Sequence, residues 1–342
     1  MWCWRGSPSR SPSLAVALAV ALALALPLVA ANGQTHVLII SGLGGDKLFS
    51  ARFNGLSYDL AAALRQRVGI PTADIIWLGE DSTQGDPSYA GRSTKENIEA
   101  QFAKVAARAR PGAQVVLVLV GHGAGDGAES RLNIPGPDLT GRDYARLLGA
   151  FAAQRVAVLD LTSASGDMLA VLSAPNRVVV TATKTALERN ESHFATFVVK
   201  AFADDVADTD KDGRVSLLEA FRYAAAETKR FYDKDSKLQT EHAQLDDDGD
   251  GRGSAEPDGR TGEGRLARRF FLDASAVATR AGATDARLPA LYGEKFALEE
   301  EVEALKLRKA TLDAAAYDTE LERVLVALAR KAREIRGIEG AR

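Results

Sequence analysis

The sequence predicts an α/β protein in which helices cover both faces of a mostly parallel β-sheet. Five short apolar runs, rich in Val and Ile, have the composition of strands that are buried on both faces. Helical patterns lie between these runs, and such strand–helix alternation is typical of a parallel sheet. About 310 residues follow the first 31, which is enough for one large domain with additions.

The expected elements follow one another at short intervals. The predicted strands are Thr35–Ile40, Asp74–Leu78, Gln114–Val120, Arg155–Leu161 and Arg177–Thr181. The predicted helices are Gly55–Gln66, Lys95–Ala109 and Gly141–Ala153. Ser93-Thr94-Lys95-Glu96 has the pattern of a capping box, and Thr140 is the expected N-cap of the third helix. In a sheet of this kind, functional side chains gather at the carboxyl ends of the strands.

The N-terminus has the pattern of a secretory signal peptide. Arg5 and Arg10 precede an apolar run, Leu14–Val29, which ends in small residues. This order of charged, apolar and small segments predicts cleavage after residues 1–31 and export to the periplasm or the extracellular space. The alternative is an uncleaved segment that anchors the chain to a membrane.

Loss of this segment limits the available chemistry. The only cysteine, Cys3, lies within it, so the mature chain has no thiol for thiolate catalysis and no disulfide. The basic count falls by two from 43, against 46 acidic residues. This balance does not favour a nucleic-acid partner, which requires a basic patch.

The mature chain is predicted to contain three parts. Residues 32–190 form the α/β core, and residues 191–275 complete that domain with an EF-hand-like helix–loop–helix and an Asp/Gly-rich segment. Residues 288–338 are expected to form a helical hairpin or coiled coil, because Leu291, Leu298, Leu305 and Leu312 recur every seven residues. Two roles stay open for this hairpin: packing on its own domain, or self-association and partner binding.

Residues Asp208–Glu219 fit a twelve-residue calcium-binding loop. Calcium takes six to eight hard oxygen ligands, and EF-hand loops supply them at fixed positions around an invariant glycine at position six, here Gly213. The predicted ligands are Asp208, Asp210, Asp212, the backbone carbonyl of Arg214, Ser216 and Glu219. Apolar helical patterns flank the loop on both sides. The sequence therefore predicts a Ca²⁺ site here.

A second, weaker calcium loop starts at Asp246. Asp246, Asp248 and Asp250 have the spacing of loop positions one, three and five. Position twelve is Pro257, which has no side-chain ligand, and Glu256 falls one place early. A solvated Asp/Gly-rich turn is the alternative interpretation.

Two further strand ends carry candidate catalytic residues. His122 lies between glycines directly after the strand Gln114–Val120, and Ser163 follows the strand Arg155–Leu161. The carboxyl ends of parallel strands share one edge, so we expect His122 and Ser163 to converge above the sheet. Asp160 lies at the same strand end but is expected to face a different partner from His122.

This order of motifs resembles the caspase/legumain clan of cysteine peptidases, most closely the C13-like, legumain-related proteins. The matching segments between Thr35 and Gly253 are Gly42–Gly45, Gly121-His122-Gly123, Pro135–Thr140, Ser163-Ala164-Ser165-Gly166 and Gln239-Thr240-Glu241-His242. The resemblance implies a caspase-like three-layer α/β/α sandwich and an ancestral endopeptidase site. It also implies that His122 is the catalytic histidine and that Ser163 occupies the place of the nucleophilic cysteine.

The serine at this place changes the expected function. A hydroxyl is far less acidic than a thiol, so Ser163 would need a well-placed base and an orienting acid. The leading hypothesis is an exported calcium-binding pseudopeptidase that binds peptides or protein partners. The alternatives are an active hydrolase that uses Ser163 and His122, and an assembly protein that acts through the C-terminal coiled coil.

Overall fold

The structure is a computed structural model that describes residues 34–81, 85–125, 127–209, 211, 213–260, 262–272, 287–307, 309 and 312–339. The predicted signal peptide at residues 1–31 lies outside these ranges, as do Asp210 and Asp212 of the first predicted calcium loop. The C-terminal helices are described by themselves. No helix within the described ranges is both long and apolar enough to span a membrane.

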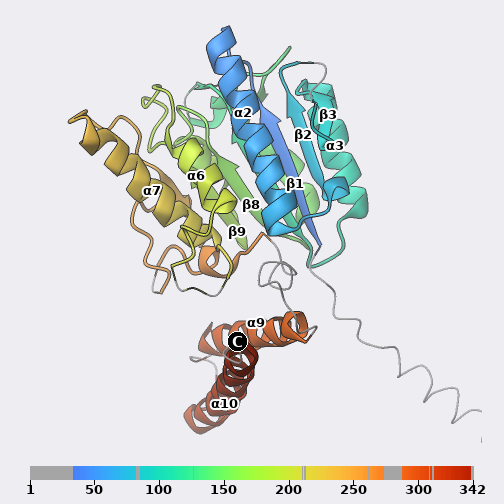
Figure 1. Ribbon diagram of the computed structural model, residues 1–342, viewed down its shortest axis with the longest axis vertical. Coiled ribbons are helices and arrows are strands. Elements are labelled where there is room, and N and C mark those ends of the chain that lie inside the picture. The colour runs from blue at the N-terminus through green and yellow to red at the C-terminus, as the bar shows by residue number, and fades with distance from the viewer. Residues whose placement is uncertain are drawn as a thin grey trace, which may run out of the picture. The chain divides into compact units, whose positions relative to one another are not determined.

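A seven-stranded sheet forms the centre of the protein, with the strand order β10-β9-β8-β4-β1-β2-β3 (Figure 1). Its strands are β1 (Thr35–Ser41), β2 (Ile75–Gly79), β3 (Tyr89–Arg92), β4 (Gln114–Val120), β8 (Arg155–Asp160), β9 (Arg177–Thr181) and β10 (Gln244–Asp246). All neighbouring pairs are parallel except β10 with β9. The predicted mostly parallel sheet is thus confirmed, and all five predicted strands are present.

The register of the central strands explains their apolar composition. β1 pairs with β4 along its whole length, from Thr35 opposite Gln114 to Ser41 opposite Val120. Every residue of both strands is buried. Such strands contact helices on both faces, which is why they lack the alternating polar residues of a half-exposed sheet.

Helices cover both faces of the sheet. The helices α2 (Lys47–Ala63), α6 (Phe194–Ala203) and α7 (Leu217–Lys234) pack on one face, where they share a buried apolar cluster with alternate strand residues (Figure 1). The helices α3 (Lys95–Arg108), α4 (Gly141–Leu148) and α5 (Met168–Leu172) cover the other face through a second cluster. The arrangement is an α/β fold with three layers.

One helix start and one helix cap differ from the prediction. The first helix begins at Lys47, not at Gly55, because the Asp46 side chain caps it by accepting from Phe49 N at 2.9 Å. A π-helical turn, Leu64–Val68, continues it. The second helix is capped by Thr94 alone, since Ser93 donates instead to the carbonyl of Ser41 at 2.7 Å.

Several short elements were not predicted. β5 (Gly123–Ala124), β6 (Arg131–Leu132) and β7 (Leu139–Thr140) form a small antiparallel sheet directly after β4. Short 3₁₀ turns occupy Thr72–Asp74, Gly127–Glu129, Gly149–Phe151 and Ala267–Arg269. The small sheet ends at Thr140, which caps α4 with a capping box, as the sequence indicates for this N-cap.

The C-terminal part contains α9 (Leu288–Leu307) and α10 (Ala314–Glu339). The two helices contact each other through a small apolar cluster that includes Val302, Leu305, Tyr317 and Val324. Ion pairs join Arg323 to Glu301, and Lys331 to Glu294 at 2.6 Å. The later residue of α10, Lys331, pairs with the earlier residue of α9, Glu294. The two helices therefore run in opposite directions.

Candidate functional sites

His122 lies where β4 ends, packed between two aromatic rings. Its ring centroid is 4.6 Å from that of Phe49 and 4.9 Å from that of Phe53, both in edge-on geometry. These phenylalanines belong to the first turns of α2, the part of the helix that the sequence analysis missed. The apolar contacts hold the His122 ring in one orientation.

Burial is also the main influence on the charge of His122. It lowers the pKa of the imidazole below its usual value, because the apolar surroundings disfavour the charged form. The carboxylates of Asp46 and Glu191 and a hydrogen bond with the backbone of Gly44 act in the opposite direction. The net result favours a neutral ring at neutral pH.

Ser163 follows β8 and is almost completely buried, with 3% exposure. Its hydroxyl accepts a hydrogen bond from the backbone N–H of Gly123 at 3.4 Å. The two loops meet so closely that a Cβ atom on Gly123 would lie 2.1 Å from the carbonyl oxygen of Ser163. Only glycine fits at position 123, which explains the second glycine of the Gly-His-Gly motif.

The two candidate residues line one small cavity. Its walls are formed by His122, Ser163, their strand neighbours Val120, Gly121 and Leu161, and Phe53, Leu56, Glu191, Ser192 and Ala195 from the α2 and α6 side. The cavity has a volume of about 10 Å³, which is room for a single water molecule. The structure thus brings His122 and Ser163 to one place, but leaves no open space for a peptide side chain.

Asp160 faces the opposite side of the sheet from this cavity. It is fully buried, and its Oδ1 atom accepts from Thr162 Oγ1 at 2.6 Å and from Thr162 N at 3.2 Å. Burial raises the pKa of the Asp160 carboxyl to about 7, and the hydrogen bonds from Thr162 act in the opposite direction. Asp160 therefore orients the segment that follows β8 and does not contact His122.

The described part of the first predicted calcium loop contains the glycine turn expected at position six. Gly213 has a φ of +83° and donates its N–H to Asp208 Oδ2 at 2.9 Å. Glu219 lies in the first turn of α7, and its carboxylate accepts hydrogen bonds from both Thr209 and Ser216 at 2.8–3.0 Å. The guanidinium group of Arg214 lies over the ring of Phe271, 3.7 Å from its centroid. The predicted ligand from this residue is the backbone carbonyl, which does not take part in that contact.

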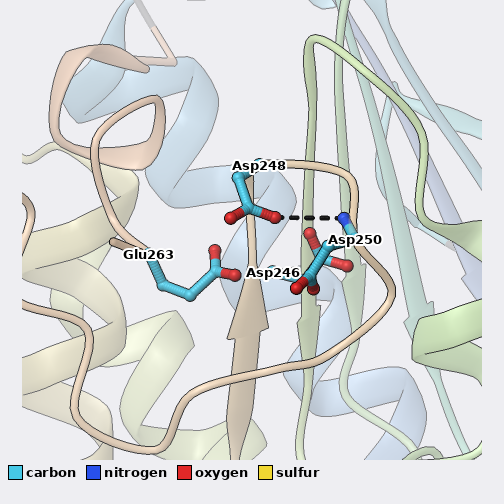
Figure 2. Close-up of side chains that lie close together, drawn as sticks. All are labelled: Asp246, Asp248, Asp250 and Glu263. Carbon is cyan, nitrogen blue, oxygen red and sulfur yellow. Dashed lines mark hydrogen bonds between the residues drawn. The ribbon is translucent and has the colours of Figure 1, made fainter. Parts of the chain in front are cut away.

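The second acidic loop brings four carboxylates together (Figure 2). One oxygen each from Asp246, Asp248, Asp250 and Glu263 lies within 4.8 Å of the others. Asp246 is fully buried and accepts from the backbone N–H groups of Gly249 and Gly251 at 3.0 and 2.9 Å. The three predicted aspartates are thus close together, and their oxygens are ligands that hard cations prefer.

Glu263 is the member of this cluster that sequence reasoning missed. A twelve-residue loop would place its last ligand at position 257, which is a proline. Instead the chain turns back at Gly259, whose N–H donates to the Glu263 carbonyl at 2.9 Å. Glycines with positive φ, +70° at Gly259 and +94° at Gly264, make this turn possible.

Asp247 holds Glu263 beside the three aspartates. Its backbone N–H donates to Glu263 Oε2 at 2.7 Å, and its carboxylate accepts from Gly264 N at 2.9 Å and Ala267 N at 2.7 Å. Burial is the main cause that raises the pKa of Glu263 to about 8, with the Asp248 and Asp247 charges acting in the same direction. The cluster is therefore electrostatically costly without a cation.

Both acidic loops contact the same stretch of chain. Arg222 of α7 donates to the carbonyl of Pro257 at 3.1 Å through Nε. Leu217, within the first loop, donates its N–H to Phe270 O at 2.9 Å, and Ser216 pairs with Phe271 as an antiparallel bridge. Residues 257–271 thus connect the second acidic loop with the first.

Comparisons with known proteins add little to this description. No protein-family model matches the sequence, and no curated protein matches it. Among solved structures, the chain is similar to the crystal structure of protein GSU0716 from Geobacter sulfurreducens, with a TM-score of 0.41 and 12% sequence identity. The match covers 66% of this chain and 95% of that one. A likeness at this level supports no statement about function.

Proposed function

We propose that this protein is an exported, calcium-binding relative of the caspase/legumain clan that binds a peptide or protein partner and does not cleave it. The observation that carries the proposal is the state of Ser163. Its hydroxyl lies in the wall of a cavity of about 10 Å³ and accepts a hydrogen bond from Gly123 N. This is the place where the clan has a reactive thiol.

The surroundings of Ser163 support an inactive site. A serine nucleophile needs a base within hydrogen-bond reach and an acid that orients the base. Of the acids around the site, Asp160 bonds Thr162 and faces the other side of the sheet, while Glu191 forms an ion pair with Arg52. His122 is held by Phe49 and Phe53 instead of by a carboxylate. Among the residues that the structure describes, the carboxylates of Asp46 and Glu191 act on His122 through their charge, but neither forms a hydrogen bond with its ring.

Calcium is proposed to brace this scaffold. Asp246, Asp248, Asp250 and Glu263 offer the all-oxygen set that Ca²⁺ prefers. In the first loop, Asp208, Asp210, Asp212, Arg214, Ser216 and Glu219 would be the ligands. A bound cation would offset the mutual repulsion of the carboxylates, and its effect on the fold would be stabilising. The carboxylates would then be unavailable for acid–base catalysis.

A proteolysis assay tests the proposed lack of activity. The purified protein is expected to leave a diverse peptide library intact, because Ser163 lacks an activated base. His122→Ala serves as the control for contaminating peptidases, and both proteins should give the same product profile. Cleavage by the wild type that disappears in His122→Ala would contradict the proposal.

An active serine hydrolase is the second candidate, favoured by the shared cavity of His122 and Ser163. It makes a distinct prediction, which is covalent labelling of Ser163 by a serine-directed fluorophosphonate. Mass spectrometry would locate the adduct, with Ser163→Ala as the matched control. We expect no adduct at Ser163, and one that depends on His122 would replace the pseudopeptidase with this candidate.

Assembly through the C-terminal hairpin is the third candidate. The observation that favours it is the exposure of two neighbouring apolar side chains on α10, Leu325 and Val326, each 44% exposed, which a second chain would cover. If this candidate is correct, deletion of residues 288–342 separates the subunits. The mass measured in solution by light scattering then falls by more than the mass of the deleted residues. An unchanged number of subunits would exclude it.

A further inference from the structure

We infer that Glu241 and His242 act as a two-residue clamp that holds the connection between β9 and α6 at two points beside the His122–Ser163 cavity and so controls access to Ser163. The inference rests on the proposed function only in taking Ser163 as the residue at the nucleophile position. The clamp belongs to the Gln239–His242 segment, which the sequence resemblance singled out and to which neither the fold nor the proposed chemistry gives a role.

Glu241 holds the end of the β9–α6 connection. Its side chain is 1% exposed and reaches the segment that precedes α6. The carboxylate accepts from Ser192 Oγ at 2.9 Å, from His193 N at 2.8 Å and from Phe194 N at 3.1 Å. It thereby caps the N-terminus of α6 from a position far along the chain. Ser192 is itself part of the cavity wall.

His242 holds an earlier part of the same connection through Glu188. The backbone N–H of His242 donates to Glu188 Oε2 at 3.0 Å, and its Nδ1 atom lies 2.6 Å from Glu188 Oε1. The carboxylate of Glu188 also accepts a hydrogen bond from Lys184 N at 2.8 Å. The backbone carbonyl of Glu188 accepts one from Ala164 N, also at 2.8 Å. Ala164 directly follows Ser163, so the chain of hydrogen bonds ends beside the nucleophile position.

The two held parts of the β9–α6 connection lie on either side of Arg189 and Asn190 and are both close to Ser163 or its neighbours. The later part carries Glu191 and Ser192 into the cavity wall, and the earlier part packs closely on the segment after Ser163. A Cβ atom on Gly166 would lie 2.1 Å from the carbonyl carbon of Lys184, which shows how little room separates the connection from the segment that follows Ser163. Release of either part of this connection therefore widens the approach to Ser163, although neither Glu241 nor His242 lines the cavity.

A single engineered thiol measures this access. Cys3→Ser removes the only natural cysteine, and Ser163→Cys then places the sole thiol of the full-length chain at the site. Its alkylation rate with iodoacetamide is measured in this background and in the same background with His242→Ala. His242 is half-exposed, so this change should leave the melting temperature nearly unaltered. The rate is expected to rise roughly tenfold, which corresponds to the loss of one charge-assisted hydrogen bond.

Three further variants make the result decisive. Glu188→Gln should raise the alkylation rate as much as His242→Ala does. His242→Gln should keep the rate close to that of the unaltered background, because the amide can still donate to Glu188. Lys229→Ala, which breaks an exposed ion pair on α7, is the matched control and should leave the rate unchanged. Equal rates in all variants would overturn the clamp, and so would an equal rise in the Lys229→Ala control. No peptide is used, so failure to find a binding partner leaves this result intact.

Discussion

Replacing Glu241 by alanine is expected to lower the free energy of unfolding by about 3 to 5 kcal/mol. The carboxylate is buried and accepts from two backbone N–H groups at the start of α6, from Ser192 and from Tyr232. Alanine leaves these donors without an acceptor in a place where water does not easily replace it, and each unsatisfied buried donor costs about 1 to 3 kcal/mol. Urea denaturation followed by circular dichroism measures the change.

The matched control for this prediction is Asp233→Ala on α7. Asp233 pairs with Lys229, but both side chains are more than half exposed. Ion pairs of this kind contribute little, about 0 to 1 kcal/mol, because water screens them and the side chains lose mobility. Similar losses of stability in the two variants would mean that the hydrogen bonds of Glu241 have no special role in the fold.

Addition of calcium is expected to raise the melting temperature, and chelation is expected to lower it. A ligand that binds only the folded state contributes about 2.7 kcal/mol when its concentration is a hundredfold above Kd. In this protein the cation would also relieve the repulsion among Asp246, Asp248, Asp250 and Glu263. Differential scanning calorimetry in calcium and in chelator measures the shift, and isothermal titration gives the number of sites.

Variants separate the two acidic loops. Glu263→Gln should remove the part of the calcium-dependent rise in melting temperature that comes from the second loop. Glu219→Ala should remove the part that comes from the first loop. Glu219→Ala also removes the capping box at Ser216, so its stability without calcium should fall as well. Glu256→Gln is the control, since this acid precedes Pro257 and lies outside the cluster. Identical melting temperatures of the wild type in calcium and in chelator would refute calcium binding.

The sheet was predictable because its strands are buried on both faces. Continuous runs of Val, Ile and Leu cannot be exposed, so β1, β4 and β8 are recognisable without any knowledge of their neighbours. The convergence of His122 and Ser163 followed from the same logic, because β4 and β8 are adjacent parallel strands whose carboxyl ends share one edge.

The start of α2 and the fourth carboxylate were missed for different reasons. Phe49 and Phe53 continue the apolar spacing of α2 towards its N-terminus, and Asp46 is a residue type that commonly caps helices. Together these two signals were sufficient to place the start of the helix at Lys47. Glu263 could not be found in this way. It joins the aspartates only because Gly259 and Gly264 turn the chain back, and because Asp247 holds the turn. Such contacts depend on tertiary structure rather than on local sequence.

The second acidic loop also closes one edge of the sheet. Leu245 of β10 exchanges both of its backbone hydrogen bonds with Ser254, at 2.9 and 2.8 Å, on the side away from β9. An uncovered edge strand offers unpaired N–H and C=O groups to any other extended chain. If a cation holds the loop in place, its removal frees this edge as well as four carboxylates. A chelated protein should then associate with itself under conditions in which the calcium-loaded protein stays monodisperse.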